Sequence, residues 1–338
     1  MNTVQDKIRG SLIGGAAGDA LGYAVEFQNE SEIFKRYSGG IRQYALDRRG
    51  LAVISDDTQM TLFTACGILN ALNHQTNMED EVLKAYFEWL DTQEIPFAKR
   101  GKKAGVTPLW DVPELFVPRA PGITCLSALR STRRFGKCSN NSKGCGGVMR
   151  VAPAGMLRGD ISELDALGGA CAYMTHQHPL GYMPAAVLAH IVNRIVFPER
   201  KLTLREIVLD SCDTLAEIYP GQPGVAELTA LLQRAIDLSE NSRPDLENIH
   251  ALGEGWVGDE ALAIAVYCCL RHEDDFSAAL IAAVNHKGDS DSTGAITGNI
   301  LGAWFGCDAM DTQWKQRLEL SDLILSIADA LAAAAEKA

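Results

Sequence analysis

The sequence lacks the positive charge and the long apolar runs that two classes of protein need. Its 31 Lys and Arg residues are outnumbered by 43 Asp and Glu residues, which gives a formal net charge of −12. Proteins that coat nucleic acid or lie on anionic membranes need a net basic surface. No apolar run approaches the roughly 20 residues that a bilayer-crossing helix requires. We therefore expect neither a nucleic-acid-coating protein nor a membrane protein.

The sequence also lacks paired cysteines and a secretion signal. Its nine cysteines form no C-x-x-C pair, and Cys268 and Cys269 lie in the apolar run ALAIAVYCCL, which is typical of small core residues. Asp6, Lys7 and Arg9 interrupt the apolar stretch that a signal peptide would need. Reduced thiols and no leader predict a cytoplasmic protein.

Strand signals are missing as well, because no pair of alternating β-branched runs flanks an Asn-Gly or Asp-Gly turn. Apolar residues instead recur at spacings of three and four, for example Val82, Tyr86 and Leu90. Helix start signals of the S/T-x-x-D/E type begin at Thr76, Ser162 and Thr203. Further periodic segments lie near residues 5–22, 58–73, 181–197, 224–239, 259–271, 275–285, 293–305 and 313–335. The pattern predicts an all-α globule of about a dozen helices.

Two longer stretches, residues 28–54 and 94–123, are rich in Gly, Pro and charge. Long irregular loops in a compact domain are usually functional or disordered. Trp110, Leu115 and Phe116 are available to hold the second stretch against the core. Its basic run KRGKK at 99–103 is more often a solvated face than a phosphate or partner site.

The first acidic motif is Ser55-Asp56-Asp57-Thr58, which precedes the largely apolar run MTLFTACGIL. Ser or Asp caps a helix N-terminus, and acidic residues favour the positive end of the helix dipole. The same oxygens, clustered on one short stretch, are the ligands that hard cations such as Mg²⁺ prefer. Both interpretations stay open at this stage.

The second acidic motif runs from His286 to Gly294 and contains Asp289 and Asp291. Residues at i and i+2 lie about 200° apart on a regular helix, so these carboxylates converge only in a loop or at a helix entrance. An EF-hand would need Glu at position 12, where this chain has Ile300. An acidic cap or a metal site remains.

Three glycine- or histidine-containing motifs are ambiguous by themselves. Residues 14–22 place Gly and Ala at helical spacing, which favours close helix contact, with Glu26 just beyond the helix end. Residues 144–150 are either a turn or a set of amide donors for a diphosphate. The pair His176 and His178 has no third zinc ligand at a useful spacing and is either a helix junction or part of a binding site.

Taken together, the motifs resemble the ADP-ribosylglycohydrolase family, which includes the ADP-ribosylarginine hydrolases. The resemblance lies, in order, in GGAAGDALGYAVEF, SDDTQM, GCGGVMRVAP, THQHPL and HKGDSDSTGAITG. It implies one compact orthogonal multi-helix domain over residues 1–338 and two divalent cations, Mg²⁺ or Mn²⁺. Crowded carboxylates would repel one another unless cations neutralise them, which agrees with that implication.

The resemblance also implies the site residues. Glu26 and Asp57 would handle protons and position the attacking water. Residues that would line the substrate pocket are Gly146, Gly147, Met149 and His176. Residues that would hold the metal ions are Ser55, Asp56, Asp57, Asp289, Asp291 and Ser292.

The implied function is cleavage of the N-glycosidic bond between ADP-ribose and a protein side chain, with an ADP-ribosylated protein as substrate and ADP-ribose as product. The D-S-D-S-T-G form resembles the arginine-directed hydrolases and favours arginine. Three alternatives remain: another linkage (serine, O-acetyl-ADP-ribose or a modified nucleobase), a non-catalytic ADP-ribose binder, and an immunity protein that reverses or blocks an ADP-ribosyltransferase toxin.

Overall fold

The computed structural model describes residues 2–101 and 104–337, and within these ranges the protein is helical without a β-strand. Three isolated β-bridges are the only extended pairings in the described ranges. The all-α prediction is confirmed. The α-helices are α1 (Val4–Tyr23), α2 (Glu30–Arg36), α3 (Asp56–His74), α4 (Met78–Glu94), α5 (Ile123–Phe135), α6 (Ile161–Tyr173), α7 (Pro179–Val196), α8 (Leu204–Ile218), α9 (Val225–Ser239), α10 (Asp245–Leu252), α11 (Gly258–Arg271), α12 (Phe276–Val284), α13 (Ser290–Phe305), α14 (Thr312–Lys315) and α15 (Ser321–Ala335).

In the described part of the chain, five short 3-10 helices connect some of these elements. They are η1 (Phe97–Lys99), η2 (Pro108–Asp111), η3 (Pro113–Phe116), η4 (Cys145–Gly147) and η5 (Ala152–Met156). None of the helices in the described ranges has both the length and the hydropathy needed to cross a bilayer.

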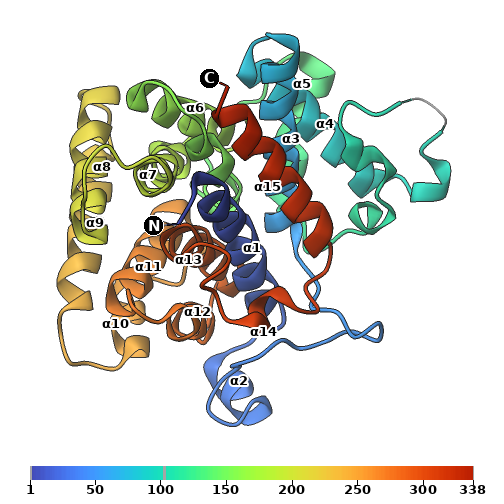
Figure 1. Ribbon diagram of the computed structural model, residues 1–338. Helices are drawn as coiled ribbons and strands as arrows, with labels where there is room; N and C mark the ends of the chain where they lie inside the picture. Colours follow the sequence, from blue (N-terminus) through green and yellow to red (C-terminus); the bar gives the residue numbers. More distant parts are fainter. Residues whose placement is uncertain (1, 102–103, 338) are drawn as a thin grey trace.

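Helices α1 and α13 lie against each other in the middle of the molecule (Figure 1). Their contact faces consist of glycines four residues apart, so the two backbones touch. A Cβ atom on Gly298 would lie 1.9 Å from the carbonyl oxygen of Gly14, and one on Gly302 would lie 2.0 Å from that of Gly10. Only glycine permits this approach. The close helix contact expected from residues 14–22 is confirmed, with α13 as the partner.

The α1–α13 pair is antiparallel, which places the end of α1 beside the start of α13. A Cβ on Gly22 would lie 2.2 Å from the carbonyl oxygen of Ser290. Farther along, the Ser11 hydroxyl donates to the Asn299 carbonyl (2.8 Å), and the Asn299 amide donates back to the Ser11 carbonyl (2.9 Å). This pairing supports one domain over residues 1–338, because both ends of the chain contribute to one core. The exact domain extent stays a prediction.

The other helices pack around this pair: α15 covers α1 and α3, α4 packs on α3, and α7 packs on α6, α8, α11 and α13. Several of these helices are apolar on almost every side, because they are enclosed by neighbours. In α11 a continuous run from Ala261 to Cys269 is buried, which confirms Cys268 and Cys269 as core residues.

The helices predicted from start signals begin where a side chain caps the first free backbone N–H groups. The predicted capping box of Thr203 with Glu206 is present at the start of α8. The predicted starts at Thr76 and Ser162 are wrong by one and two residues. Asn77 accepts the N–H of Asp80 (2.9 Å) at the start of α4, and Asp160 caps α6 by accepting the N–H groups of Ser162 and Glu163. These carbonyl and carboxylate oxygens satisfy amides that a helix start leaves free.

The segment predicted as one helix over 313–335 is divided into α14 and α15. The reason is local, because Arg317 and Leu320 adopt positive φ angles of 60° and 59°, which a helix cannot contain. The pattern also gave no signal for α2, α5 and α10.

The stretch 94–123 contains η1, η2 and η3, and its apolar side chains hold it against the core, as predicted. Leu115 is buried, and the rings of Trp110 and Phe116 lie 5.2 Å apart. Within the basic run 99–103, Lys102 and Lys103 lie outside the described residues.

Candidate active site

The first wall of the site is the entrance of α3. Ser55 is its N-cap and accepts the N–H of Asp57 (3.1 Å), so Asp56 and Asp57 lie in the first turn. Asp19, on α1, holds this turn in place. Its carboxylate accepts the backbone N–H groups of Ser55 (3.0 Å) and Thr58 (3.1 Å), and it also accepts a hydrogen bond from the Thr58 hydroxyl. The capping interpretation of this motif is therefore confirmed, and it leaves the Asp56 and Asp57 carboxylates buried at the helix start.

The second wall is the entrance of α13. Asp289 precedes the helix and Asp291 lies in its first turn, which confirms the predicted loop that enters a helix. Gly288 makes the bend with φ +129°, and a Cβ there would lie 2.0 Å from the Glu254 carbonyl oxygen. The Ser292 hydroxyl donates to the Asp57 carboxylate (2.8 Å) and thereby joins the two helix entrances across 235 positions of sequence.

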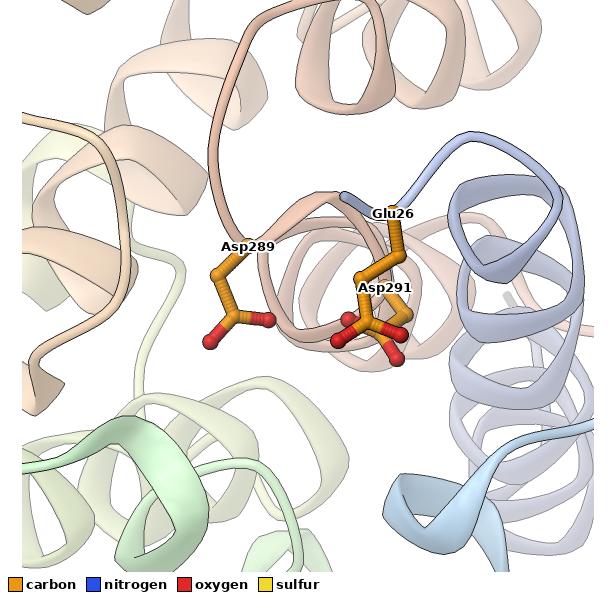
Figure 2. Close-up of side chains that lie close together, drawn as sticks. All are labelled: Glu26, Asp289 and Asp291. Atoms are coloured by element: carbon orange, nitrogen blue, oxygen red, sulfur yellow. The ribbon is translucent and has the colours of Figure 1, made fainter. Parts of the chain in front are cut away.

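Glu26 completes the acidic cluster. It lies three residues past the end of α1, and the antiparallel α1–α13 contact carries it to the start of α13. Carboxylate oxygens of Glu26, Asp289 and Asp291 lie within 4.8 Å of one another. Figure 2 shows these side chains pointing toward the same space at the entrance of α13.

The acidic residues line a cavity of about 580 Å³, a volume typical of small-molecule sites. Nine of the eleven predicted site residues line it: Glu26, Asp56, Asp57, Gly146, Met149, His176, Asp289, Asp291 and Ser292. The other two lie behind the wall. Ser55 acts as the α3 cap, and Gly147 faces α7, where a Cβ would lie 2.6 Å from the Gly181 carbonyl oxygen. Among the described residues that line the cavity there is no Lys or Arg.

Burial and mutual repulsion dominate the electrostatics of this cluster. Burial, followed by the charge of Asp291, raises the pKa of Asp56, Asp57 and Asp289 well above the ordinary value. The same two causes raise the pKa of Glu26 to about 11. No Lys or Arg among the described lining residues neutralises these carboxylates, and such a cluster fits a divalent cation, which prefers carboxylate oxygens as ligands. Glu26 Oε2 is buried without a hydrogen-bond partner in the described chain, which agrees with a ligand at this position.

The sequence did not single out Asp19, Cys145, Phe27 or Trp256. A lone acid in a Gly- and Ala-rich apolar helix was the available signal for Asp19. The Cys145 thiol donates to the Asp289 carboxylate (2.6 Å), which no local pattern indicates. Phe27 has a positive φ of 65° and stacks on Trp256 with ring centroids 5.8 Å apart at the mouth of the cavity. A positive φ at a bulky residue marks a strained position, and such positions cluster at functional sites.

Replacing Asp19 with alanine is expected to lower the free energy of unfolding by about 3 kcal/mol, because the buried N–H groups of Ser55 and Thr58 would lose their acceptor. Urea unfolding followed by circular dichroism measures this change. Asp213→Ala, at an exposed position of α8, is the control and should change stability by less than about 0.5 kcal/mol. Equal stabilities of the two variants would contradict the role assigned to Asp19.

Known proteins resemble this chain in sequence and in fold. The ADP-ribosylglycohydrolase family model matches residues 1–338. The ADP-ribosyl-[dinitrogen reductase] glycohydrolase of Rhodospirillum rubrum is 26% identical over 331 residues, 94% of this chain and 92% of that protein. Human ADP-ribosylhydrolase ARH3 is 26% identical over 203 residues, 53% of this chain and 54% of that protein.

A solved structure described as an ADP-ribosylglycohydrolase-related protein complex has the same fold. It superposes with a TM-score of 0.70 at 22% identity and covers 99% of this chain and all of that one. With the family model matching from end to end, this chain belongs to the ADP-ribosylglycohydrolase family and is a hydrolase.

Proposed function

We propose that this protein hydrolyses the N-glycosidic bond between ADP-ribose and an arginine side chain of a modified protein, with two Mg²⁺ ions as cofactors. The observation that carries the proposal is the convergence of acidic residues from three distant segments (Glu26, Asp56–Asp57 and Asp289–Asp291) in one cavity. A chain that only kept the fold would not need to hold so many buried carboxylates together, because each is unfavourable without a partner.

The charge of the cavity supports the arginine linkage. Its described lining carries five carboxylates and no Lys or Arg. With the two proposed +2 ions bound, five carboxylates leave a net charge of about −1, which suits a cationic guanidinium leaving group, whereas a neutral serine hydroxyl gains less from it. The stacked rings of Phe27 and Trp256 at the mouth add faces that attract a cation. The sequence form D-S-D-S-T-G at 289–294 also resembles the arginine-directed hydrolases.

The proposed metal ligands that line the cavity are Asp56, Asp57, Asp289, Asp291 and Ser292. The sixth proposed ligand, Ser55, would bind from its cap position through the hydroxyl lone pair that the Asp57 N–H leaves free. A pair of divalent cations supplies neutralising charge, and Lewis acidity toward bound hydroxyl groups and water. Two ions of +2 nearly balance the five carboxylates of the cavity, which supports a count of two. Mn²⁺ accepts the same hard oxygen ligands.

The chain's own residues account for the remaining chemistry. Hydrolysis breaks the bond between C1″ of the ribose and the guanidinium nitrogen, forms a bond from a water oxygen to C1″, and moves one proton to the leaving nitrogen. The positive charge that develops on the ribose is stabilised by nearby carboxylates. We assign the water-positioning and proton-carrying roles to Asp57 and Glu26, both of which face the cavity. Gly146, Met149 and His176 also line the cavity, and we assign them to the diphosphate and ribose.

Peptides ADP-ribosylated on arginine, serine or cysteine test the proposal, with free ADP-ribose as the measured product. We expect release from the arginine peptide alone, with Mg²⁺ present and not with EDTA. Release from another peptide would retain the hydrolase and overturn the arginine assignment. Undiminished release in EDTA would overturn the proposed metal requirement.

A further inference from the structure

Arg150 is a buried cation that the proposed chemistry does not use. Its side chain is fully buried behind the cavity wall, under the ring of Tyr86 at 4.4 Å. Its guanidinium donates to the Cys171 carbonyl (3.0 Å) and to the Thr175 hydroxyl oxygen (2.6 Å). None of the hydrogen-bond partners of Arg150 in the described residues is a carboxylate. Burying a guanidinium without a counter-ion is unfavourable, so its position calls for an explanation.

The contact of Arg150 with Thr175 determines where the Thr175 proton goes. Arginine is only a donor, so the Thr175 oxygen accepts this bond and its own O–H is free to donate. Two acceptors lie near: Nδ1 of His176 at 2.8 Å and the Ala172 carbonyl at 3.4 Å. Because hydroxyl hydrogen bonds span about 2.5–3.0 Å, we assign the Thr175 proton to the shorter contact, the one with His176 Nδ1.

That bond in turn selects the tautomer of His176. A neutral imidazole carries one proton, so an Nδ1 that accepts leaves the proton on Nε2. Burial and the charge of Arg150 lower the pKa of His176 to about 3, so the ring is neutral at physiological pH. Nε2 has no hydrogen-bond partner in the described chain and lies against the cavity wall, 3.3 Å from the places that a Cβ on Gly144 or Gly146 would occupy.

We propose that Arg150 and Thr175 act as positioning residues, fixing His176 as a neutral Nε2–H donor that binds an oxygen of ADP-ribose in the cavity. The inference rests on the proposed function, which places ADP-ribose there. A neutral donor is useful at this position because it adds no positive charge beside a site that has to retain divalent cations. Arg150 thus acts at a distance, through Thr175, and touches neither substrate nor metal.

The test combines a spectroscopic signature with binding. Long-range ¹H–¹⁵N spectra of protein labelled on histidine nitrogens report which ring nitrogen carries the proton, and comparison with His176→Gln assigns the signal. We expect a protonated Nε2 and an unprotonated Nδ1 in the wild type at neutral pH. Thr175→Val keeps the volume and removes the hydroxyl, so we expect a mixture of tautomers and a roughly three- to tenfold rise in the Kd for ADP-ribose.

Two controls separate positioning from general damage. Thr175→Ser restores the hydroxyl and should restore both the tautomer and the affinity. Thr214→Val makes the same change in α8, where the hydroxyl donates to the Asp210 carbonyl of its own helix (3.1 Å), and should change neither the tautomer nor the affinity.

A protonated Nδ1 in the wild type would overturn the inference without any variant, even if Thr175→Val fails to fold. An unchanged Kd in Thr175→Val would overturn the contact with ADP-ribose. The tautomer is measured without turnover, so a protein that releases no ADP-ribose from any peptide would refute the proposed function and still report which nitrogen of His176 carries the proton.

Discussion

Gly298→Ala is expected to lower the free energy of unfolding by about 3 kcal/mol and to abolish most hydrolysis, although alanine is the better helix former. The intrinsic preference for alanine over glycine in a helix is worth only about 1 kcal/mol. Against it, the new Cβ would lie 1.9 Å from the Gly14 carbonyl oxygen and 2.4 Å from its carbon. Both atoms belong to the backbone of α1, so no side chain can rotate away and the two helices have to separate.

The rate of hydrolysis should fall even under conditions in which the variant stays folded, because the contact between α1 and α13 also aligns the acidic residues of the site. Separation of α1 from α13 moves Glu26 and Asp19 relative to Asp289 and Asp291, and displacements of about 1 Å are enough to lower rates roughly 100-fold. Urea unfolding gives the free energy, and ADP-ribose release at a temperature where the variant stays folded gives the rate.

Gly221→Ala is the matched control. Gly221 is exposed with φ +69°, and a Cβ there meets nothing within 4 Å, so its only penalty is the left-handed backbone, about 1 kcal/mol. If Gly298→Ala were as stable and as active as Gly221→Ala, the backbone contact would not determine the geometry of the site.

This contact also shows what the sequence could and could not predict. Glycines four residues apart at 14, 18 and 22 predict that another backbone approaches α1, but they do not name it. Gly294, Gly298 and Gly302 repeat the spacing on α13. The spacing alone does not say which helix pairs with α1, because any other helix with glycines four residues apart would fit the same pattern. The apolar periodicity of a helix is similarly local, so most helices were predicted, whereas two of the three predicted start positions and the break near Arg317 were not.

In the candidate site, too, local features could be predicted from the sequence and contacts between distant segments could not. Asp289 and Asp291 at i and i+2 predict a helix entrance, because two such carboxylates diverge on a regular helix. Their meeting with Asp57 depends on a hydrogen bond across 235 positions, and in the sequence only the family resemblance joined the two motifs. Asp19, Cys145 and Arg150 are single residues that act on partners far along the chain, so neither periodicity nor spacing identifies them.

Asp57→Asn is expected to reduce turnover by at least about 100-fold with Mg²⁺ present, since it removes a proposed metal ligand and proton acceptor in one step. The amide has the shape of the carboxylate, and its oxygen can still accept the Ser292 hydroxyl. The measurement is kcat and KM for the ADP-ribosylated arginine peptide over a Mg²⁺ titration. Asp213→Asn, at an exposed position of α8, is the matched control and should retain the wild-type rate.

Thermal unfolding distinguishes a loss of function in Asp57→Asn from a loss of fold, because the two predict changes of opposite sign in the Tm of the metal-free protein. In the wild type, burial and the charges of Asp291 and Asp56 oppose ionisation of Asp57, so its carboxylate is unfavourable without metal. The neutral amide should therefore raise the Tm of the metal-free protein, or leave it unchanged. Mg²⁺ should raise the Tm of the wild type by binding the native state, and raise that of Asp57→Asn less.

A lower Tm in EDTA would mean that the amide damages the fold and that the rate says nothing about mechanism. Near-normal turnover in both Asp57→Asn and Glu26→Gln, with metal bound, would show that neither residue has the role assigned to it. A large loss in Asp57→Asn alone, with a smaller Mg²⁺ response, would place Asp57 between metal and water and would leave Glu26 to bind the leaving arginine. The Mg²⁺ dependence of Tm is thus the measurement that connects the acidic cluster to its chemistry.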